Sequence, residues 1–235
     1  MRATVVALGV TLSACLASSS SDPPNGTAVD HGRALFSDPK ASPSASNTFT
    51  CVTCHRGEDT TTTIQPGAPL AGVTARRSFW GGQRLDLLES VNDCRMFFMD
   101  ARAPWTIDDE DARAMYAYVA QLPPTLPAPV AFTVVSPTDL PTGDAKRGAI
   151  AYDLACRTCH GTAHGGAGRL ATFIPVLPDD VVRGHAVLTP EKLRLVFIGK
   201  ARMGAFRGGG SMPPFSREVL ADDDLAGIVA FFGLD

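Results

Sequence analysis

The sequence predicts an all-α protein made of two tandem domains joined by a proline-rich linker. A Cys-x-x-Cys-His pattern occurs twice in the 235 residues, and segments with helical hydrophobic spacing surround both copies in the same order. Six prolines fall within residues 123–143, which predicts an extended and fairly stiff connector. Within it, the run 131–135 predicts a short strand lying on a domain. We therefore expect a first domain over residues 28–122 and a second over residues 144–235.

Three helices are expected in the first domain. The first covers residues 31–36, ahead of the first Cys-x-x-Cys-His copy. The second covers residues 83–92, because its leucines and Val91 recur at helical spacing. Thr106 is expected to cap the third helix, since an acidic run that suits the start of a helix follows it. Pro123 ends this third helix.

The second domain repeats this order. Residues 148–152 carry the pattern of a first helix. Thr189 followed by Pro190 predicts the cap and the first position of a middle helix that continues to about Ile198. The last helix is expected over residues 221–234, with three acidic residues near its start.

Each Cys-x-x-Cys-His copy is the attachment signal for c-type haem. Two thiols form thioether bonds with the two vinyl positions of one porphyrin, and two intervening residues in a helical turn give roughly the separation required. The adjacent histidine is then placed beneath the ring, where it ligates the iron. The sequence therefore predicts two covalently bound haem c groups. The expected attachment residues are Cys51, Cys54, Cys156 and Cys159, and the expected iron ligands beside them are His55 and His160.

Two other interpretations of the motif fit less well. A zinc site of this type brings its second Cys-x-x-Cys pair within about 15–20 residues of the first. These two pairs lie roughly a hundred residues apart. A structural disulfide within each pair suits a two-residue gap poorly, and it leaves both histidines unexplained.

Each half of the chain resembles a class I cytochrome c domain. In that family the first and last helices cross, and a glycine of one helix meets an aromatic residue of the other. Gly32 with Tyr118, and Gly148 with Phe231, match this pattern. The resemblance covers nearly all of the chain after its leader. It implies that a sixth ligand completes the coordination of each iron and helps to set its potential.

The sixth ligand of the second iron is predicted to be Met212. It stands in the run Gly-Gly-Gly-Ser-Met-Pro-Pro-Phe at residues 208–215, between the middle and last helices. This Met-Pro loop resembles the ligand loop of class I cytochromes, in which glycines let the backbone approach the haem. Met203, beside Gly204, is the alternative, although a methionine there also suits simple packing. Thioether ligation raises the potential of a haem.

The sixth ligand of the first iron is open between Met99 and Cys94, with Met96 as a third candidate. Met99 precedes a proline-containing loop, which suits a class I ligand. The run Val-Asn-x-Cys that ends at Cys94 resembles the SoxA subunit of sulfur oxidation and thiosulfate dehydrogenase. In both families the cysteine at that place ligates iron, and a thiolate lowers the potential. A buried free cysteine that only packs is the remaining interpretation of Cys94.

Residues 1–14 predict a lipoprotein signal peptide. Arg2 precedes an apolar run too short to span a bilayer, and the ending Leu-Ser-Ala-Cys at Cys15 resembles the bacterial lipobox. A signal of that type is cut before the cysteine, which is then acylated. Residues 15–27 suit a polar tether, and an ordinary secretory signal with an incidental cysteine is the alternative. We expect a membrane-anchored lipoprotein on the periplasmic side of the bacterial cell envelope.

Charge and ligation favour an electron carrier over an enzyme. Loss of Arg2 leaves 20 of the 21 basic residues against 24 acidic ones, and a net charge of −4 gives no sign of a nucleic-acid partner. The expected partners are redox proteins of the envelope and, through the anchor, the membrane. Six-coordinate haems leave no position open for a substrate. The alternative function is haem-dependent oxidation of a small sulfur compound such as thiosulfate, with Cys94 at its site.

Basic side chains outside the motifs receive weaker predictions. Arg76, Arg77 and Arg95 are candidates for pairing with haem propionates or with an anionic substrate. His164 is expected to be a surface-loop residue rather than an iron ligand. His185 stands in no ligand pattern, so no chemical role is predicted for it.

Overall fold

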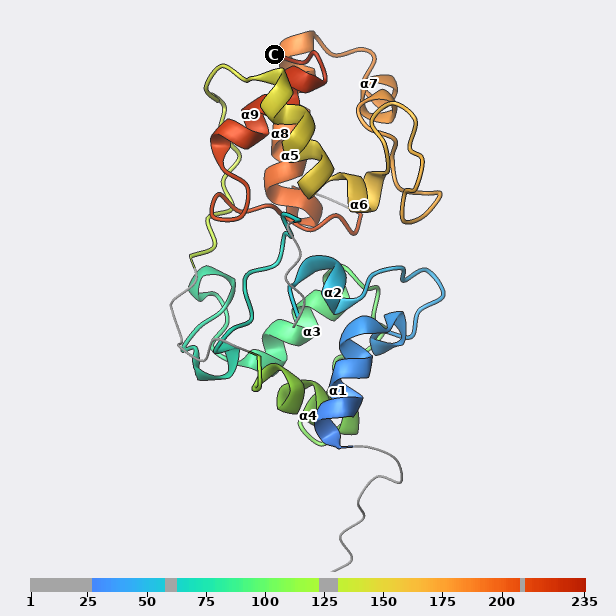
Figure 1. The fold of residues 1–235 in the computed structure, drawn as a ribbon, viewed down its shortest axis with the longest axis vertical. Helices are drawn as coiled ribbons and strands as arrows, with labels where there is room; N and C mark the ends of the chain where they lie inside the picture. The colour runs from blue at the N-terminus through green and yellow to red at the C-terminus, as the bar shows by residue number, and fades with distance from the viewer. Residues whose placement is uncertain (1–26, 58–62, 123–130, 208–209) are drawn as a thin grey trace, which may run out of the picture.

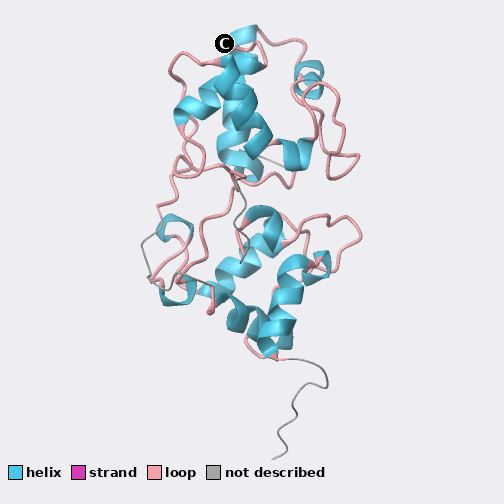
Figure 2. Ribbon diagram, viewed as in Figure 1, coloured by secondary structure: helices cyan, strands magenta, loops and turns pink. Residues whose placement is uncertain are grey.

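The computed structural model describes residues 27–57, 63–122, 131–207 and 210–235. These residues form helices joined by loops, and no strand occurs among them (Figures 1 and 2). This agrees with the predicted all-α class. The predicted signal peptide, Cys15, nearly all of the tether and residues 123–130 of the linker lie outside the described residues.

The helices fall into two sets along the chain, which we call the N-terminal half and the C-terminal half (Figure 1). The N-terminal half contains α1 (Ala28–Ser37), α2 (Cys51–Cys54), α3 (Leu87–Phe97) and α4 (Glu110–Val119), with the 3-10 turns η1 (Pro39–Ala41), η2 (Val73–Ala75) and η3 (Trp80–Gly82). The C-terminal half contains α5 (Ala145–Ala155), α6 (Arg157–His160), α7 (Asp179–Gly184), α8 (Pro190–Met203) and α9 (Asp222–Phe231), with the 3-10 turn η4 (Gly204–Arg207).

The first and last helices pack closely in both halves. Gly32 on α1 lies so near α4 that a Cβ atom there would stand 2.0 Å from the carbonyl oxygen of Ala114 and 2.7 Å from Cβ of Tyr118. The predicted contact between glycine and tyrosine is confirmed. In the C-terminal half, a Cβ atom on Gly148 of α5 would stand 1.8 Å from the carbonyl oxygen of Gly227 on α9.

The predicted contact between Gly148 and Phe231 stays a prediction. The atoms nearest to a Cβ atom on Gly148 belong to Gly227 and Ile228, so the two backbones approach each other directly. The Phe231 ring packs on Tyr152, with the ring centroids 5.9 Å apart. The buried Tyr152 hydroxyl donates a hydrogen bond of 2.8 Å to the carbonyl of Gly161, the residue after the second motif.

The middle helix of the N-terminal half is displaced from the predicted range 83–92. It begins at residue 87 because Asp86 caps it, accepting the N–H of Glu89 at 2.9 Å. It then runs on to Phe97. Cys94 therefore lies on a helix, where its side-chain direction is fixed by the helical backbone.

Two other helix starts give opposite outcomes. Thr106 is not the cap of α4, because Asp109 takes that position and accepts hydrogen bonds from the N–H and hydroxyl of Thr106. Thr189 does cap α8, and Pro190 occupies its first turn as predicted. This helix continues past Ile198 to its end at residue 203.

The strand predicted over residues 131–135 does not form. A strand needs a neighbouring strand to satisfy its backbone groups, whereas Thr133 is held by a loop of the C-terminal half. Its N–H and hydroxyl donate to the Glu218 carboxylate at 2.9 and 2.6 Å, and its carbonyl accepts the N–H of Arg217 at 3.1 Å. This end of the linker is therefore docked on the C-terminal half.

The two halves touch each other (Figure 1). The N–H of Ile64 donates to the carbonyl of Leu154 at 2.9 Å, and the Ile64 side chain packs on the C-terminal core. That core gathers α5, α8 and α9 around fully buried residues such as Ile198 and Leu225. No helix among the described residues combines the length and the apolar content that a membrane span requires.

Candidate cofactor sites

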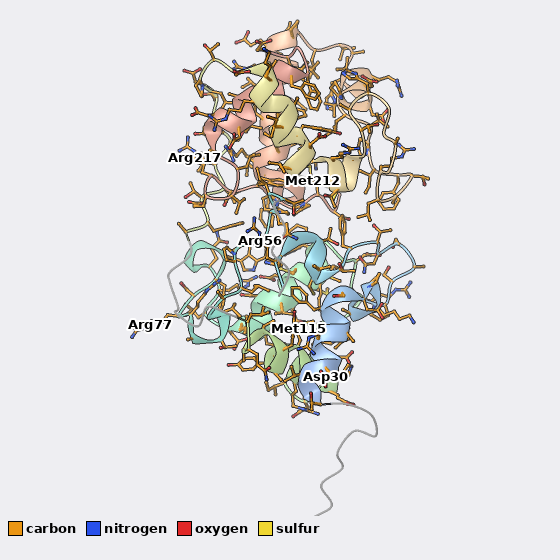
Figure 3. All side chains as sticks on the ribbon, in the orientation of Figure 1. Asp30, Arg56, Arg77, Met115, Met212 and Arg217 are labelled. Carbon is orange, nitrogen blue, oxygen red and sulfur yellow. The ribbon has the colours of Figure 1, made fainter. Side chains whose placement is uncertain are left out.

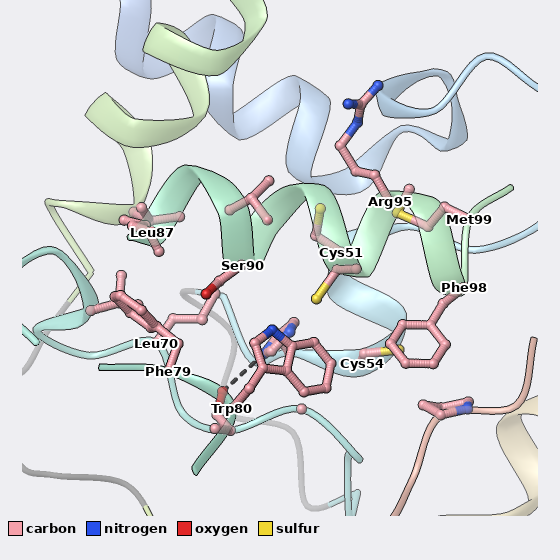
Figure 4. Close-up of a pocket in the computed structure, with 18 of the residues that line it drawn as sticks. Cys51, Cys54, Leu70, Phe79, Trp80, Leu87, Ser90, Arg95, Phe98 and Met99 are labelled. Carbon is pink, nitrogen blue, oxygen red and sulfur yellow. Dashed lines mark hydrogen bonds between the residues drawn. The ribbon is translucent and has the colours of Figure 1, made fainter. Parts of the chain in front are cut away.

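The first Cys-x-x-Cys-His copy lines a cavity of about 170 Å³ in the N-terminal half (Figure 4). Helices α2 and α3 supply its cysteines, and the loop from Pro66 to Trp80 supplies most of the opposite wall. Cys51 and Cys54 belong to α2, which Thr50 caps by accepting the N–H of Thr53. Since that cap holds the short helix in place, it also fixes the direction of both thiols.

The second copy lines a larger cavity of about 920 Å³, which residues of both halves surround. Cys156 ends α5 and precedes α6, which carries Cys159 and His160. The loop around Pro175 and α8 supply much of the remaining wall, and the N-terminal half adds residues from the segments 49–54 and 63–66. This volume lies at the upper end of the range of about 300–1,000 Å³ that is usual for cofactor pockets.

Both motif histidines are oriented by a backbone carbonyl. Nδ1 of His55 lies 2.9 Å from the carbonyl oxygen of Ala68, and Nδ1 of His160 lies 2.8 Å from that of Pro175. A carbonyl oxygen only accepts, so Nδ1 carries the proton in each ring and Nε2 keeps its lone pair. This is the tautomer of a histidine that ligates a metal through Nε2. Burial also lowers the pKa of both rings, which favours the neutral form.

Gly67 leaves space for the His55 ring. A Cβ atom on Gly67 would stand 2.4 Å from Cε1 and Nδ1 of the His55 ring and 2.6 Å from the carbonyl of Cys54. The loop can therefore pass beside the ring only because this residue has no side chain.

The four motif thiols are unpaired and partly buried. Burial raises the pKa of Cys51 to about 11 and that of Cys156 to about 12. These thiols are therefore protonated near neutral pH. Their positions beside a cavity, on or next to a helical turn, suit covalent attachment to a planar group.

Two of the three candidate ligands of the first iron line the first cavity. Cys94 faces it from α3, and Met99 follows the end of that helix with 4 % of its surface exposed. Met96 does not line the cavity and is 41 % exposed. Burial raises the pKa of Cys94 to about 12, with smaller contributions from Cys51 and Asp93. The choice between Cys94 and Met99 stays open on geometry.

Met212 lines the second cavity, whereas Met203 does not. Its carbonyl accepts the N–H of Ala205 at 2.7 Å, which closes the loop between α8 and Met212. Gly204 starts that loop at φ +52°, and a Cβ atom there would stand 2.3 Å from the Met212 carbonyl. Met212 lies close to the N-terminal half (Figure 3). The geometry therefore favours Met212 over Met203.

A buried arginine fixes the segment that follows Met212. Arg202 is fully buried, and its guanidinium donates to the carbonyls of Phe215, Ser216 and Leu220 at 3.1, 3.3 and 2.6 Å. It also pairs with the Asp222 carboxylate at 2.6 Å. The sequence analysis missed this residue.

Arg95 likewise binds backbone carbonyls beside the first cavity. It is 4 % exposed, and it donates to the carbonyls of Ala41 and Ala103 at 2.9 and 3.3 Å. Its guanidinium carbon lies 3.8 Å from the centre of the Trp105 ring. The available signal was positional, since each arginine stands near the end of a middle helix and ahead of a candidate ligand loop.

The other basic side chains either line a cavity or lie on the surface. Arg76 lines the first cavity, its Nη2 donates to the carbonyl of Ala71 at 2.8 Å, and its Nε is buried without a partner. Arg77 points into solvent (Figure 3). His164 is exposed and pairs with Asp179, as expected for a surface residue. His185, for which no chemical role was predicted, lines the second cavity.

The two cavities share a wall. Four residues line both of them: Phe49, Cys54, Pro66 and Pro213. Pro213 directly follows Met212, so the ligand loop of the C-terminal half closes part of the N-terminal cavity. A planar group attached at Cys54 and another attached at Cys159 would therefore be neighbours.

These residues fit covalently bound haem c on chemical grounds. Each cavity offers two thiols, a histidine with a free Nε2 and at least one further sulfur, which is the donor set that the group needs. The unpartnered Nε of Arg76 suits an anionic propionate at the first site. The second cavity has ample volume. The first cavity is smaller, at about 170 Å³.

Comparison with known proteins places the C-terminal half in a family. Residues 143–232 match the model of the family described as cytochrome c oxidase, cbb3-type, subunit III. The C-terminal half is therefore a cytochrome c domain, for which covalently bound haem c and electron transfer are implied.

A solved structure is also similar to the chain. It is the thiosulfate dehydrogenase TsdBA from Marichromatium purpuratum in its "as isolated" form, with 20% sequence identity and a TM-score of 0.40. The match covers 89% of this chain and 46% of that one, so the chain spans about half the length of the structure it matches. Among curated proteins, no sequence matches that of this chain.

Proposed function

We propose that the chain is a lipid-anchored dihaem c-type cytochrome that relays electrons in the bacterial cell envelope. The observation that carries the proposal is the repeated histidine site. In both halves a Cys-x-x-Cys-His histidine donates through Nδ1 to a carbonyl and keeps Nε2 for a metal. Bound haem c would supply a reversible one-electron centre in each half.

The chain's own residues have three tasks in this proposal. Cys51, Cys54, Cys156 and Cys159 attach the porphyrins, and His55 and His160 each give one axial nitrogen. Met212 gives the sixth ligand in the C-terminal half, and either Cys94 or Met99 gives it in the N-terminal half. Two sulfur-ligated, six-coordinate sites have no position open to substrate, which supports relay over catalysis.

The shared wall supports relay between the sites. Cys54 lines both cavities, and burial together with the nearby thiols of Cys94 and Cys159 raises its pKa. Close packing of the two sites would bring them within the short range that electron transfer needs. Apolar residues such as Phe49 and Pro213 would keep water out of the junction.

The test is a potentiometric titration of the purified holoprotein, with carbon monoxide binding measured on the reduced form. We expect two one-electron transitions and little binding of carbon monoxide, because both irons have two protein ligands. High-spin iron that binds carbon monoxide readily in both halves would contradict the relay.

The anchor is a separate part of the proposal. Cys15 would carry the acyl chains after removal of residues 1–14 and hold the protein on the periplasmic side of the membrane. Growth with a labelled fatty acid tests it. Label should enter the wild-type protein and be lost in the Cys15→Ala variant, whereas label retained in the variant would contradict acylation at this residue.

A second function is favoured by Cys94, a thiol outside the motifs that lines the first cavity. The local resemblance to SoxA and to thiosulfate dehydrogenase suggests oxidation of a small sulfur compound there, with electrons leaving through the C-terminal half. Purified oxidised protein mixed with thiosulfate tests this function. Reduction of the haems that is lost in the Cys94→Ala variant supports it, and no reduction in the wild type rules it out for this substrate.

A further inference from the structure

Five aromatic side chains join the two halves, and we call them the aromatic bridge: Trp80, Phe97, Phe98, Phe132 and Phe206. The ring of Phe206, on η4 of the C-terminal half, meets three rings of the N-terminal half. The centroid distances are 5.8 Å to Trp80, 6.1 Å to Phe97 and 6.3 Å to Phe98. These lie within the range of favourable aromatic contacts.

One end of the bridge reaches the ligand segment of the first iron. Trp80 and Phe98 line the first cavity and lie near Cys54 (Figure 4). The N–H of Phe98 donates to the carbonyl of Cys94 at 3.1 Å, and Phe98 is bonded directly to Met99. Whichever of the two sulfurs is the ligand, its residue is therefore joined directly to the backbone of Phe98.

The other end reaches the ligand segment of the second iron. Phe206 follows Ala205, whose N–H donates to the Met212 carbonyl at 2.7 Å. Gly204 precedes both, and its carbonyl accepts Nζ of Lys200 at 3.2 Å. A displacement of the Phe206 ring would therefore move the residues that hold Met212.

Trp80 sits at the centre of the bridge in a strained conformation. Its φ of +52° is one that bulky residues rarely adopt. Its ring contacts Phe132, Phe98 and Phe206 at 5.3, 6.1 and 5.8 Å. These contacts keep the Trp80 backbone in its strained conformation, so a movement of either ligand segment would allow that backbone to relax.

We propose that the aromatic bridge couples axial ligation at the two sites, with Phe206 as a positioning residue for Met212. The arrangement of Cys94 and Met99 at the end of α3 then influences how firmly Met212 is held at the second iron. This inference rests on the proposed function, since it assumes haem in both halves.

The test measures ligation at the second iron in the holoprotein. The readouts are the charge-transfer absorption of an iron–methionine bond and the affinity of the oxidised protein for imidazole, which competes with Met212. In the Phe206→Ala variant we expect the absorption to weaken and the imidazole affinity of the second site to rise on the order of tenfold. The Phe206→Trp variant should restore both readouts.

A second variant approaches the bridge from the other half. Phe97 is 49 % exposed and does not line the first cavity, so Phe97→Ala should disturb little else. We expect a change of the same sign at the second iron. Tyr116→Ala is the matched control, since this ring is also 49 % exposed and lies on α4.

Comparison of first-site variants separates the bridge from simple charge repulsion between haems. Replacing Cys94 or Met99 should alter imidazole binding at the second site, and this response should vanish when Phe206→Ala is added. A response that persists in the double variants would overturn the proposal. Unchanged methionine ligation in Phe206→Ala and Phe97→Ala, with both haems present, would overturn the bridge proposal and leave the proposed function standing. Absence of one haem would overturn the proposed function.

Discussion

The two halves hold their motif histidines in the same way and differ in what faces them. Nδ1 of His55 and of His160 donates to a loop carbonyl at nearly equal distances, 2.9 and 2.8 Å. In the cavity that His160 lines, the candidate ligand is Met212, on a loop closed by its own backbone. In the other half two sulfurs from α3 and its end compete for the position, beside a cavity of 170 Å³ rather than 920 Å³.

This difference indicates which part of such a site is repeated and which part varies. The attachment motif and its carbonyl form one local unit, which a duplicated sequence preserves. The sixth ligand comes from a distant segment, so it depends on how each half packs. Differences in that ligand would give the two irons different potentials.

Removal of one attachment motif at a time is expected to have the largest effect, and it tests whether both halves bind haem. Replacement of Cys51 and Cys54 by alanine should halve the haem content, and replacement of Cys156 and Cys159 should do the same, because thioether bonds hold each group. Haem staining of denatured protein and spectroscopic haem quantification measure this. If the N-terminal pair can be replaced without loss of haem, only the C-terminal half binds it.

Gly67→Ala should affect only the N-terminal site. The new Cβ would stand 2.4 Å from the His55 ring, so the ring or the loop must shift. We expect a loss of stability of about 1–3 kcal/mol and a changed low-spin signal from the first iron alone. Gly184→Ala is the control, since nothing lies within 4 Å of a Cβ there. Equal effects of the two variants in denaturant unfolding and in spectra would contradict this account.

The buried arginine of each half is expected to stabilise the protein by a different amount. Arg202→Met leaves the carbonyls of the ligand loop without a donor, and we expect it to cost roughly 3 kcal/mol of stability. Arg95→Met should cost less, about 2 kcal/mol, because this side chain has no bonded carboxylate among its described partners. Urea unfolding measures both, with the exposed Arg77→Met as the control. An unchanged iron–methionine absorption in Arg202→Met would show that this residue does not position Met212.

The smallest expected effect concerns the linker. Burial raises the pKa of Glu218, but hydrogen bonds from the hydroxyl and N–H of Thr133 outweigh it and lower the pKa to about 2. Because the folded pKa is depressed, this contact stabilises the protein above the ordinary pKa of a carboxyl group and is lost as the pH falls toward 2.

Thr133→Val should therefore cost less than about 1 kcal/mol near neutral pH and nothing at low pH. Unfolding of wild type and variant at several pH values measures this. A difference in stability that does not depend on pH would contradict the assigned role of Glu218.

The sequence predicted the features that depend on short spacing. The cap at Thr189 is such a local pattern, and it lies where it was expected. The contact of Gly32 with Tyr118 was available only through the family resemblance. At Gly148 a second glycine, Gly227, stands on the partner helix, so the two backbones approach each other directly.

Features that depend on tertiary contacts were not predictable. The strand at residues 131–135 is absent because Glu218 binds that backbone, and nothing in the local sequence indicates a partner 85 residues away. The roles of Arg95 and Arg202 depend on carbonyls that folding brings to them. The placement of His185 in the second cavity likewise follows from the path of a loop.

The most direct test of the central claim is an electron paramagnetic resonance spectrum of the oxidised protein with both haems inserted. The account predicts two low-spin signals, one of the histidine–methionine type that is lost in a Met212→Ala variant. The other should be lost or change its type in variants of Cys94 or Met99 and should remain present in Met212→Ala, and its type identifies the first ligand. A single low-spin signal, or high-spin iron in both halves, would contradict the account.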